Sequence, residues 1–319
     1  MIRVTIVGAG HYARSIVARK YAECPGCSLV GVISPRAPAE RLHGTPLAGL
    51  PLVRNAIEWC ALHGQPGEED LFDLCVHPDA ILPAMRPLVD CGARAFVLPK
   101  PLATTRHGLD ELIRFVRAAG LWAAVASQWH YSRVTAMLRE ALEKLSSPLA
   151  VEAEFSQLFS ADQLRHYTTH SALLPHMLQI LHSAGLWSPD QRAHIGVKAD
   201  GATALNIRID SPSTGNRITL RTDLQATNKS RLLNVRDPAG SIVTADFLAI
   251  FRDGRTEKQP AIEINGHRIE ILEDNILVMV HRHISGRIEG TPYLGIDSYL
   301  SVNEALVEIV EKSGQAGLA

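Results

Sequence analysis

"IRVTIVGAGHYA", residues 2 to 13, carries the strongest fold signal in the chain. An apolar run typical of a buried strand leads straight into a glycine-rich turn, and a helix is expected directly afterwards. The turn has the spacing G-x-G-x-x-A: Gly8 permits the tight turn, Gly10 lets the backbone approach a pyrophosphate, and Ala13 allows the helix to pack closely on the strand. The helix N-terminus would hold the phosphates. The stretch therefore predicts a dinucleotide-binding domain; the alternative is a degenerate domain of the same fold that binds nothing.

The first 126 residues continue this alternation of short apolar runs and helix-like segments. Further strands are expected at 27–34, 50–53, 71–77, 94–99 and 121–127, and helices at 11–23, around 55–63, and at 80–93 and 108–120. Two prolines in the segment 80–93 predict an irregular first turn. The pattern is that of a parallel sheet wound with helices, so the predicted fold class is α/β, with an N-terminal Rossmann doubly wound parallel sheet at residues 1–126.

The pattern changes after residue 126. Helices are expected at 134–145, 171–185, 274–286 and 296–313, with an alternating strand at 149–159 and several alternating runs after residue 193. Alternation of apolar and polar residues is typical of antiparallel strands with one solvated face. The sequence therefore predicts a C-terminal α+β domain at residues 127–319, built on a mostly antiparallel open sheet and serving substrate binding and oligomerisation.

Composition narrows the classes of partner. The chain has 32 Lys+Arg against 33 Asp+Glu, which gives no reason to expect nucleic acid or an anionic membrane as a partner. No apolar run approaches the roughly 20 residues that span a bilayer, and the N-terminus has no secretory pattern. The five cysteines are odd in number, and "CPGC" at 24–27 is a single pair that we interpret as a turn. We expect a cytoplasmic protein whose partners are small molecules.

The end of the second expected strand indicates which dinucleotide binds. It reads "VISPR", residues 32 to 36, where an NAD site usually has an acid for the ribose hydroxyls. Ser34 and Arg36 could instead hold a 2′-phosphate, so NADP(H) is the predicted cofactor and NAD(H) remains possible. The alternative is that Arg36 is a solvated surface charge. His11 and Tyr12, inside the glycine turn, complete this part of the predicted cofactor site.

Four segments resemble the glucose–fructose oxidoreductase and inositol dehydrogenase family (Gfo/Idh/MocA-type). They are the glycine turn, "PKPLA" at 99–103, the helical segment "SALLPHMLQILHSAG" at 171–185, and the chain's ending from "GTPYLGIDSYL" at 290–300 onward. The resemblance spans nearly the whole chain, although the middle strands match in layout only. It implies an NAD(P)-dependent oxidoreductase.

The resemblance also implies roles for particular residues. Lys100 takes the place of a lysine that points at substrate beside the nicotinamide, and Pro101 that of a proline, often in a cis bond, that shapes the cofactor pocket. His176 takes the place of the family's histidine facing the nicotinamide. His77 and Pro78, in "VHP", lie where the family's backbone borders the cofactor.

The departures from the family pattern bear on the direction of the reaction. Pro99 replaces the usual glutamate before the lysine, and Ala172 stands where an Asp often precedes the histidine. An oxidation needs a base to take the hydroxyl proton, whereas a reduction needs a proton donor. The missing acid and the NADP-like pocket both favour reduction.

Histidines and polar residues near His176 supply further candidates. The predicted substrate-binding set is Gln128, His130, Tyr167, His170 and His176, chosen from the segment after the sixth strand and from proximity along the chain. His166 is a further candidate. His176 and His182 lie six residues apart and do not share a helix face, so no metal site is predicted.

Three functions follow from these observations. The leading hypothesis is an NADPH-dependent reductase of a C=O or C=N bond, with Lys100 as principal proton donor and His176 orienting substrate or sharing that role. The substrate would lie between the edge of the Rossmann sheet and the polar-faced sheet. The alternatives are an NAD(P)-dependent sugar, inositol or polyol dehydrogenase and a non-catalytic NADP(H)-binding regulator. We also expect a homo-oligomer, a dimer or tetramer, formed through an exposed sheet face with apolar residues.

Overall fold

The computed structural model describes residues 1–36, 39–165, 167–188, 194–200, 203–212, 214–248, 250–252 and 255–314. The chain divides into two compact units. The first comprises Met1–Gln128 and Ile276–Tyr299, and the second Trp129–Asn275 and Leu300–Ala319. The return of Ile276–Tyr299 to the first unit has no counterpart in the sequence pattern. That 1–126 and 127–319 are separate domains stays a prediction.

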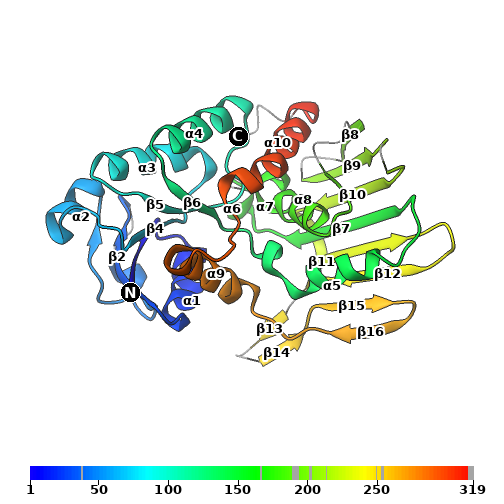
Figure 1. Cartoon of the computed structure of the whole chain (residues 1–319), viewed down its shortest axis with the longest axis horizontal. Helices are drawn as coiled ribbons and strands as arrows, with labels where there is room; N and C mark the ends of the chain where they lie inside the picture. Colours follow the sequence, from blue (N-terminus) through cyan, green and yellow to red (C-terminus); the bar gives the residue numbers. More distant parts are fainter. Residues whose placement is uncertain are drawn as a thin grey trace. The chain divides into compact units, whose positions relative to one another are not determined.

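The first unit is built on a six-stranded parallel sheet in the order β3-β2-β1-β4-β5-β6 (Figure 1). Its strands are β1 (Ile2–Val7), β2 (Cys27–Ile33), β3 (Leu52–Val53), β4 (Asp70–Leu74), β5 (Ala95–Leu98) and β6 (Trp122–Val125). Strand order reverses beside β1, so the loops after β1 and β4 leave the same edge of the sheet in opposite directions. Ligands of open α/β sheets bind at such a switch point, and the Rossmann arrangement predicted from sequence is confirmed.

Helices connect these strands as the alternation predicts. They are α1 (Ala18–Glu23), preceded by the π-helical turn η1 (Ala13–Val17), η2 (Ala39–Leu42), α2 (Ala56–His63), α3 (Ile81–Asp90) and α4 (Arg106–Ala118), with α9 (Asn275–Glu289) later in the chain. The irregular first turn expected for α3 is present as the 3₁₀ turn η3 (Pro78–Ala80). Thr105 caps α4 by accepting a hydrogen bond from the Gly108 backbone N–H at 3.2 Å.

A buried polar pair lies in the first unit's core. Asp73 on β4 is 3% exposed and accepts a 2.8 Å hydrogen bond from the Tyr21 hydroxyl of α1. Burial raises the pKa of Asp73 to about 6, because the charged form loses its hydration. The pair ties the helix after the glycine turn to the strand beside it.

The second unit is built on an eight-stranded sheet in the order β16-β15-β12-β11-β7-β10-β9-β8 (Figure 1). Its strands are β7 (Ala150–Leu158), β8 (His194–Ala199), β9 (Ala204–Asp210), β10 (Arg217–Asp223), β11 (Gln225–Arg236), β12 (Ile242–Asp246), β15 (Ala261–Ile264) and β16 (His267–Glu270). All neighbours are antiparallel except β7 and β10. The mostly antiparallel sheet predicted from sequence is confirmed; β16 and the separate hairpin of β13 (Ile250–Arg252) and β14 (Arg255–Lys258) were not predicted.

Helices α5 (Arg133–Leu142) and α8 (Leu174–Ser183) contact this sheet. The predicted single helix at 171–185 is in fact two, α7 (Thr169–Ala172) and α8, with the break at Leu173. The remaining helices are the short α6 (Ala161–Leu164), the 3₁₀ turn η4 (Gln128–Tyr131) and the last helix α10 (Ile296–Lys312). No helix that the structure describes is both long and apolar enough to cross a membrane.

The other face of the second unit's sheet is charged where an apolar face was expected. Glu152 and Glu154 are exposed on β7, beside the exposed Arg217 and Arg221 on β10. Alternating charges of both signs keep a sheet face soluble and can also pair across an interface. Oligomerisation stays a prediction, because this charged face does not offer the apolar contact surface that was expected.

Candidate functional site

The glycine turn after β1 has one glycine that the fold requires and one that it does not. Gly8 has φ +100°, and a Cβ there would lie 2.4 Å from the Cys75 carbonyl oxygen, so only glycine fits. A Cβ at Gly10 would meet no atom within 4 Å. Since packing within the protein does not demand glycine at position 10, the space beside it suits a ligand that approaches the backbone. This arrangement fits the pyrophosphate of a dinucleotide.

The helix begins directly after that space. The Arg14 backbone N–H donates to the Gly10 carbonyl at 3.1 Å, and Ala13 is buried, as the close helix–strand packing requires. His11 and Tyr12 are both exposed at this end of the helix, and the His11 ring lies 3.3 Å from the Ser15 hydroxyl. The backbone N–H groups of the first turn are therefore available to an anion.

Two arginines belong to the neighbourhood of the loop after β2. Ser34 continues β2 by donating its backbone N–H to Val53 at 2.8 Å, and Arg36 is exposed two residues later. Arg14, in the helix after the glycine turn, donates from its guanidinium to the carbonyl oxygen of Arg41 in η2. The sequence did not single out Arg14, because only the fold brings that helix against this loop. Its guanidinium adds positive charge beside this loop.

The loops after β4 and β5 carry the remaining predicted residues of this unit. His77 Nδ1 lies 3.3 Å from the Asp79 carboxylate, and Pro78 opens η3. The Lys100–Pro101 peptide bond is cis, as the resemblance implies. Pro101 is buried and Lys100 is partly exposed. Lys100 therefore lies at the carboxyl edge of the sheet, where the ends of parallel strands bring functional groups together.

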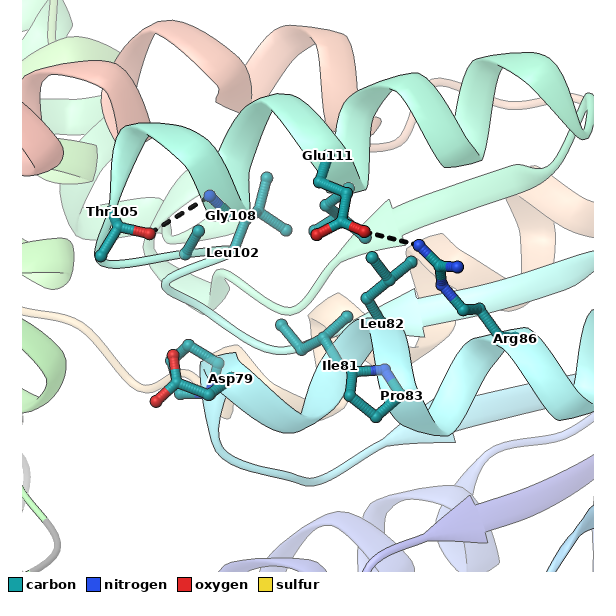
Figure 2. Close-up of a pocket in the computed structure, with 12 residues that line it drawn as sticks. Asp79, Ile81, Leu82, Pro83, Arg86, Leu102, Thr105, Gly108 and Glu111 are labelled. Carbon is teal, nitrogen blue, oxygen red and sulfur yellow. Dashed lines mark hydrogen bonds and ion pairs between the residues drawn. The ribbon is translucent and has the colours of Figure 1, made fainter.

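A pocket of about 540 Å³ lies between α3 and α4 in the first unit (Figure 2). Its walls are largely apolar, and it includes Pro78 of the predicted cofactor set. Glu111 is ion-paired with Arg86 at 2.6 Å at one end, as Figure 2 shows. The other carboxylate of the lining, Asp79, is the one paired with His77. The pocket borders the loops after β4 and β5, and its acids are already engaged, so we assign it no role in proton transfer.

In the second unit, the indole of Trp129 fixes His176. Trp129 Nε1 donates to His176 Nδ1 at 2.8 Å, and the two residues are 6% and 7% exposed. An indole N–H can only donate, so Nδ1 must accept and the ring proton of neutral His176 lies on Nε2. The two residues are 47 positions apart in the sequence, so no local signal reveals the contact.

His130 contacts the same helix at a different level. Its Nδ1 lies 3.4 Å from the Ser183 hydroxyl, which also accepts a 2.6 Å hydrogen bond from the Gln179 side chain. Ser183 is seven residues beyond His176, about 10 Å along the helix axis. Burial, followed by the charges of His182 and Arg139, lowers the pKa of His130.

The other predicted substrate residues are dispersed. His170 is buried and lies 3.3 Å from the Ser313 hydroxyl, and burial lowers its pKa to about 4, which keeps it neutral. Tyr167 is exposed and packs edge-on against Phe159. Gln128 closes the first unit, and His166 lies outside the described residues. His170 thus has an interior, structural environment, whereas His176 is held in one tautomer.

The cysteines and histidines of the described chain do not assemble a metal centre. No group of three or more His, Cys, Asp or Glu side chains there could hold a metal ion. The five cysteines are free thiols, and in the predicted turn at 24–27 the Cys24 sulfur lies 3.5 Å from His281 Nδ1.

Comparison with known proteins gives likeness in structure only. No family model matches the chain, and no curated protein does. Among solved structures, UDP-N-acetylglucosamine 3-dehydrogenase GnnA from Acidithiobacillus ferrooxidans matches with a TM-score of 0.76 and 18% identity, over 100% of this chain and 99% of that one. The 3-ketoreductase KijD10 from Actinomadura kijaniata, solved with TDP-benzene and NADP, matches with a TM-score of 0.75 and 14% identity, over 98% and 96%.

A third match is an oxidoreductase from Agrobacterium radiobacter, solved with NAD⁺, L-tartaric acid and magnesium. Its TM-score is 0.74 at 13% identity, over 99% of this chain and 97% of that one. At these identities the likeness concerns the fold. The α/β fold class predicted from sequence is therefore confirmed: the chain has the fold of these solved oxidoreductases along essentially its whole length.

Proposed function

We propose that the protein is an NADPH-dependent oxidoreductase that reduces a C=O or C=N bond of a small molecule. The observation that carries the direction of the reaction is the 2.8 Å hydrogen bond from Trp129 Nε1 to His176 Nδ1. Neutral His176 then presents an N–H at Nε2, which can donate a hydrogen bond to a substrate oxygen or nitrogen. The same nitrogen cannot take a proton from an alcohol, because it already carries one.

Protonation of His176 at Nδ1 is also disfavoured. A second ring proton would face the Trp129 N–H and leave that buried donor without an acceptor. A base for alcohol oxidation would therefore have to break this contact, whereas a hydrogen-bond donor for a carbonyl group would keep it. Among the two hypotheses for His176, orienting the substrate is favoured over sharing the proton-donor role.

Lys100 is the proposed proton donor. Its ammonium group can supply the proton that the substrate oxygen or nitrogen needs as hydride arrives at carbon. Hydride itself is supplied by the reduced nicotinamide when the cofactor is bound. His77, Pro78 and Pro101 lie on the loops at the same edge of the sheet and are the residues proposed to border it.

The proposed cofactor preference rests on charge. "VISPR" has no acid for a ribose hydroxyl, and Arg36 and Arg14 both belong to the neighbourhood of the loop after β2. Two guanidinium groups near a 2′-phosphate would favour NADPH over NADH. One solved neighbour was crystallised with NADP and another with NAD⁺, so the fold accommodates either.

We propose a homo-oligomer as well, now through charge complementarity. The exposed acids of β7 beside the exposed arginines of β10 form a surface that could pair with a second copy turned by 180°. A shift of the wild type to monomer at high salt, measured by light scattering, would support this surface; a salt-independent oligomer would not.

Titration of the protein with NADPH and NADH, followed by nicotinamide fluorescence, tests the cofactor assignment. We expect tighter NADPH binding, with the preference reduced at least tenfold in Arg36→Ala and unchanged in Arg19→Ala, an exposed arginine of α1 that serves as control. Equal binding of the two nucleotides would favour the alternative hypothesis of a sugar, inositol or polyol dehydrogenase.

A screen of ketones, aldehydes and imines for NADPH consumption tests the reaction. Lys100→Met should retain NADPH binding and lose turnover by about 100-fold or more. Binding of NADPH without turnover of any substrate, in either direction, would favour the non-catalytic regulator.

A further inference from the structure

One cation in the second unit is placed as if to meet an anion from outside the chain. Arg231 lies on β11 and pairs in register with Phe155 of β7, and its guanidinium lies 5.5 Å from the Phe155 ring centre. The Phe155 side chain is buried, and so are Leu233 and Val235, which alternate with Arg231 along β11. Arg231 therefore occupies an apolar position of the strand and points to the covered face of the sheet.

Arg231 has no acid to neutralise it. The ion pairs of the described residues include none to Arg231, and its polar partner there is the Gln157 side-chain oxygen at 3.4 Å. The Arg231 side chain is half-buried, and an arginine that loses part of its hydration is usually paired with an acid. Burial lowers the pKa of Arg231 to about 10, which still leaves it charged at neutral pH.

A second cation lies on the same strand, and an unsatisfied hydroxyl lies one strand beyond Phe155. Lys229 lies two residues earlier on β11 with an exposed side chain, and partial loss of hydration, followed by the charge of Arg231, lowers its pKa. Two like charges held near each other are costly unless an anion lies between them. On the other side of Phe155, the buried Thr222 hydroxyl of β10 has no hydrogen-bond partner in the described chain.

The cluster is linked to His176 by ring contacts within the same unit. Phe155 contacts Phe247, with centroids 6.3 Å apart, Phe247 contacts Trp129 at 5.3 Å, and Trp129 holds His176. A ligand held at Arg231 would thus lie on the same side of the sheet as the histidine that the proposed reaction uses.

We propose that Arg231, with Lys229 and Gln157, forms a binding site for an oxyanion, a carboxylate or a phosphate, carried by a small-molecule ligand. The planar guanidinium matches both oxyanions with two parallel hydrogen bonds. Naming that ligand as the substrate rests on the proposed function; binding of the oxyanion does not. The substrate class is then an acid or a phosphate ester, and neutral sugars are excluded from it.

The test is a nuclear magnetic resonance titration of the full chain without cofactor, with inorganic phosphate in one arm and acetate in the other. The Arg231 Nε–Hε signal, identified by its loss in Arg231→Lys, should shift and saturate in at least one arm. The Gln157 side-chain amide should report binding at least tenfold weaker in Arg231→Gln. Arg236→Gln, at an exposed position on the opposite face of β11 itself, should bind as the wild type does.

The arm that saturates identifies the oxyanion as phosphate or carboxylate. An Arg231 signal that moves in neither arm would overturn the proposal, and so would unchanged binding in Arg231→Gln. If phosphate shifts only the Gly10 amide resonance, it binds at the glycine turn. That result would also overturn the proposed site at Arg231. Should Arg231→Gln fail to fold, Arg231→Lys keeps the charge without the planar fork, and the wild-type signal decides by itself. Because no nucleotide or turnover is needed, failure here leaves the reductase proposal to its own tests.

Discussion

Alanine at Gly8 and alanine at Gly10 should have opposite effects, although the two glycines lie two residues apart in one turn. At Gly8 the backbone is left-handed, which costs an alanine about 1–2 kcal/mol. The added Cβ would also lie 2.4 Å from the Cys75 carbonyl oxygen, a backbone atom that cannot simply rotate away. Overpacking of this kind costs about 1–3 kcal/mol. Gly8→Ala should therefore lose about 2–5 kcal/mol of unfolding free energy.

At Gly10 the same methyl group meets nothing within 4 Å. Gly10→Ala should change the unfolding free energy by less than about 1 kcal/mol, with any change toward greater stability because glycine loses more backbone freedom on folding. Its NADPH affinity should fall at least tenfold, about 1.4 kcal/mol, since the methyl group occupies the space left for the pyrophosphate.

Urea denaturation followed by circular dichroism measures the first effect, and NADPH fluorescence titration measures the second. Gly44→Ala, another left-handed glycine with nothing within 4 Å, serves as a control for backbone strain without a clash. NADPH binding by Gly10→Ala that equals the wild type would contradict the assignment of the pyrophosphate space. Stability of Gly8→Ala no lower than that of Gly44→Ala would contradict the predicted clash at Gly8.

Three further predictions concern stability. Asp73 has a folded pKa of about 6, above its unfolded value. Its contribution to the free energy of unfolding is therefore present below about pH 4 and is lost as the pH rises toward 6. In pH-dependent denaturation, Asp73→Asn should lack about 3 kcal/mol of this loss of stability. His170 has a folded pKa of about 4, below its unfolded value. Its contribution to the free energy of unfolding is therefore present above about pH 6.5 and is lost as the pH falls. The wild type should lose about 3 kcal/mol between pH 6.5 and 4 through this group, and His170→Gln should not. Wild-type stability that matches either variant at every pH contradicts that assignment. Thr105→Ala should cost about 1 kcal/mol by uncapping α4, measured by urea denaturation, whereas Thr105→Ser should cost little.

The parts of the fold that sequence predicts are those with a local physical cause. The turn after β1 needs glycine at position 8 because of its own backbone geometry. Strands and amphipathic helices are recognisable from the spacing of their apolar residues. The break between α7 and α8 has a local cause too: Pro175 lies at the start of α8, inside the segment 171–185 for which the sequence pattern predicts one helix. Proline at a helix start is a signal that could have placed the boundary correctly.

Contacts between residues far apart in the chain could not be predicted from the sequence. Trp129 and His176 are joined only by the packing of η4 on α8, and Arg14 reaches the loop after β2 only because the helix crosses it. β7 and β10 pair in parallel inside an otherwise antiparallel sheet, and strand order of this kind depends on the whole topology. Arg231 did leave a local trace, since it interrupts the apolar positions shared by Leu233 and Val235.

The direction of the proposed reaction depends on the tautomer of His176, which long-range ¹H–¹⁵N correlation spectroscopy of the histidine rings measures in wild type and Trp129→Phe. We expect wild-type His176 to show the neutral form with the proton on Nε2 across pH 5.5 to 8, and the form to become mixed and pH-dependent in Trp129→Phe. That result supports a hydrogen-bond donor for a substrate that is being reduced. A wild-type His176 that carries its proton on Nδ1, or that titrates freely in this range, would make Nε2 available as a base and contradict the assignment of direction.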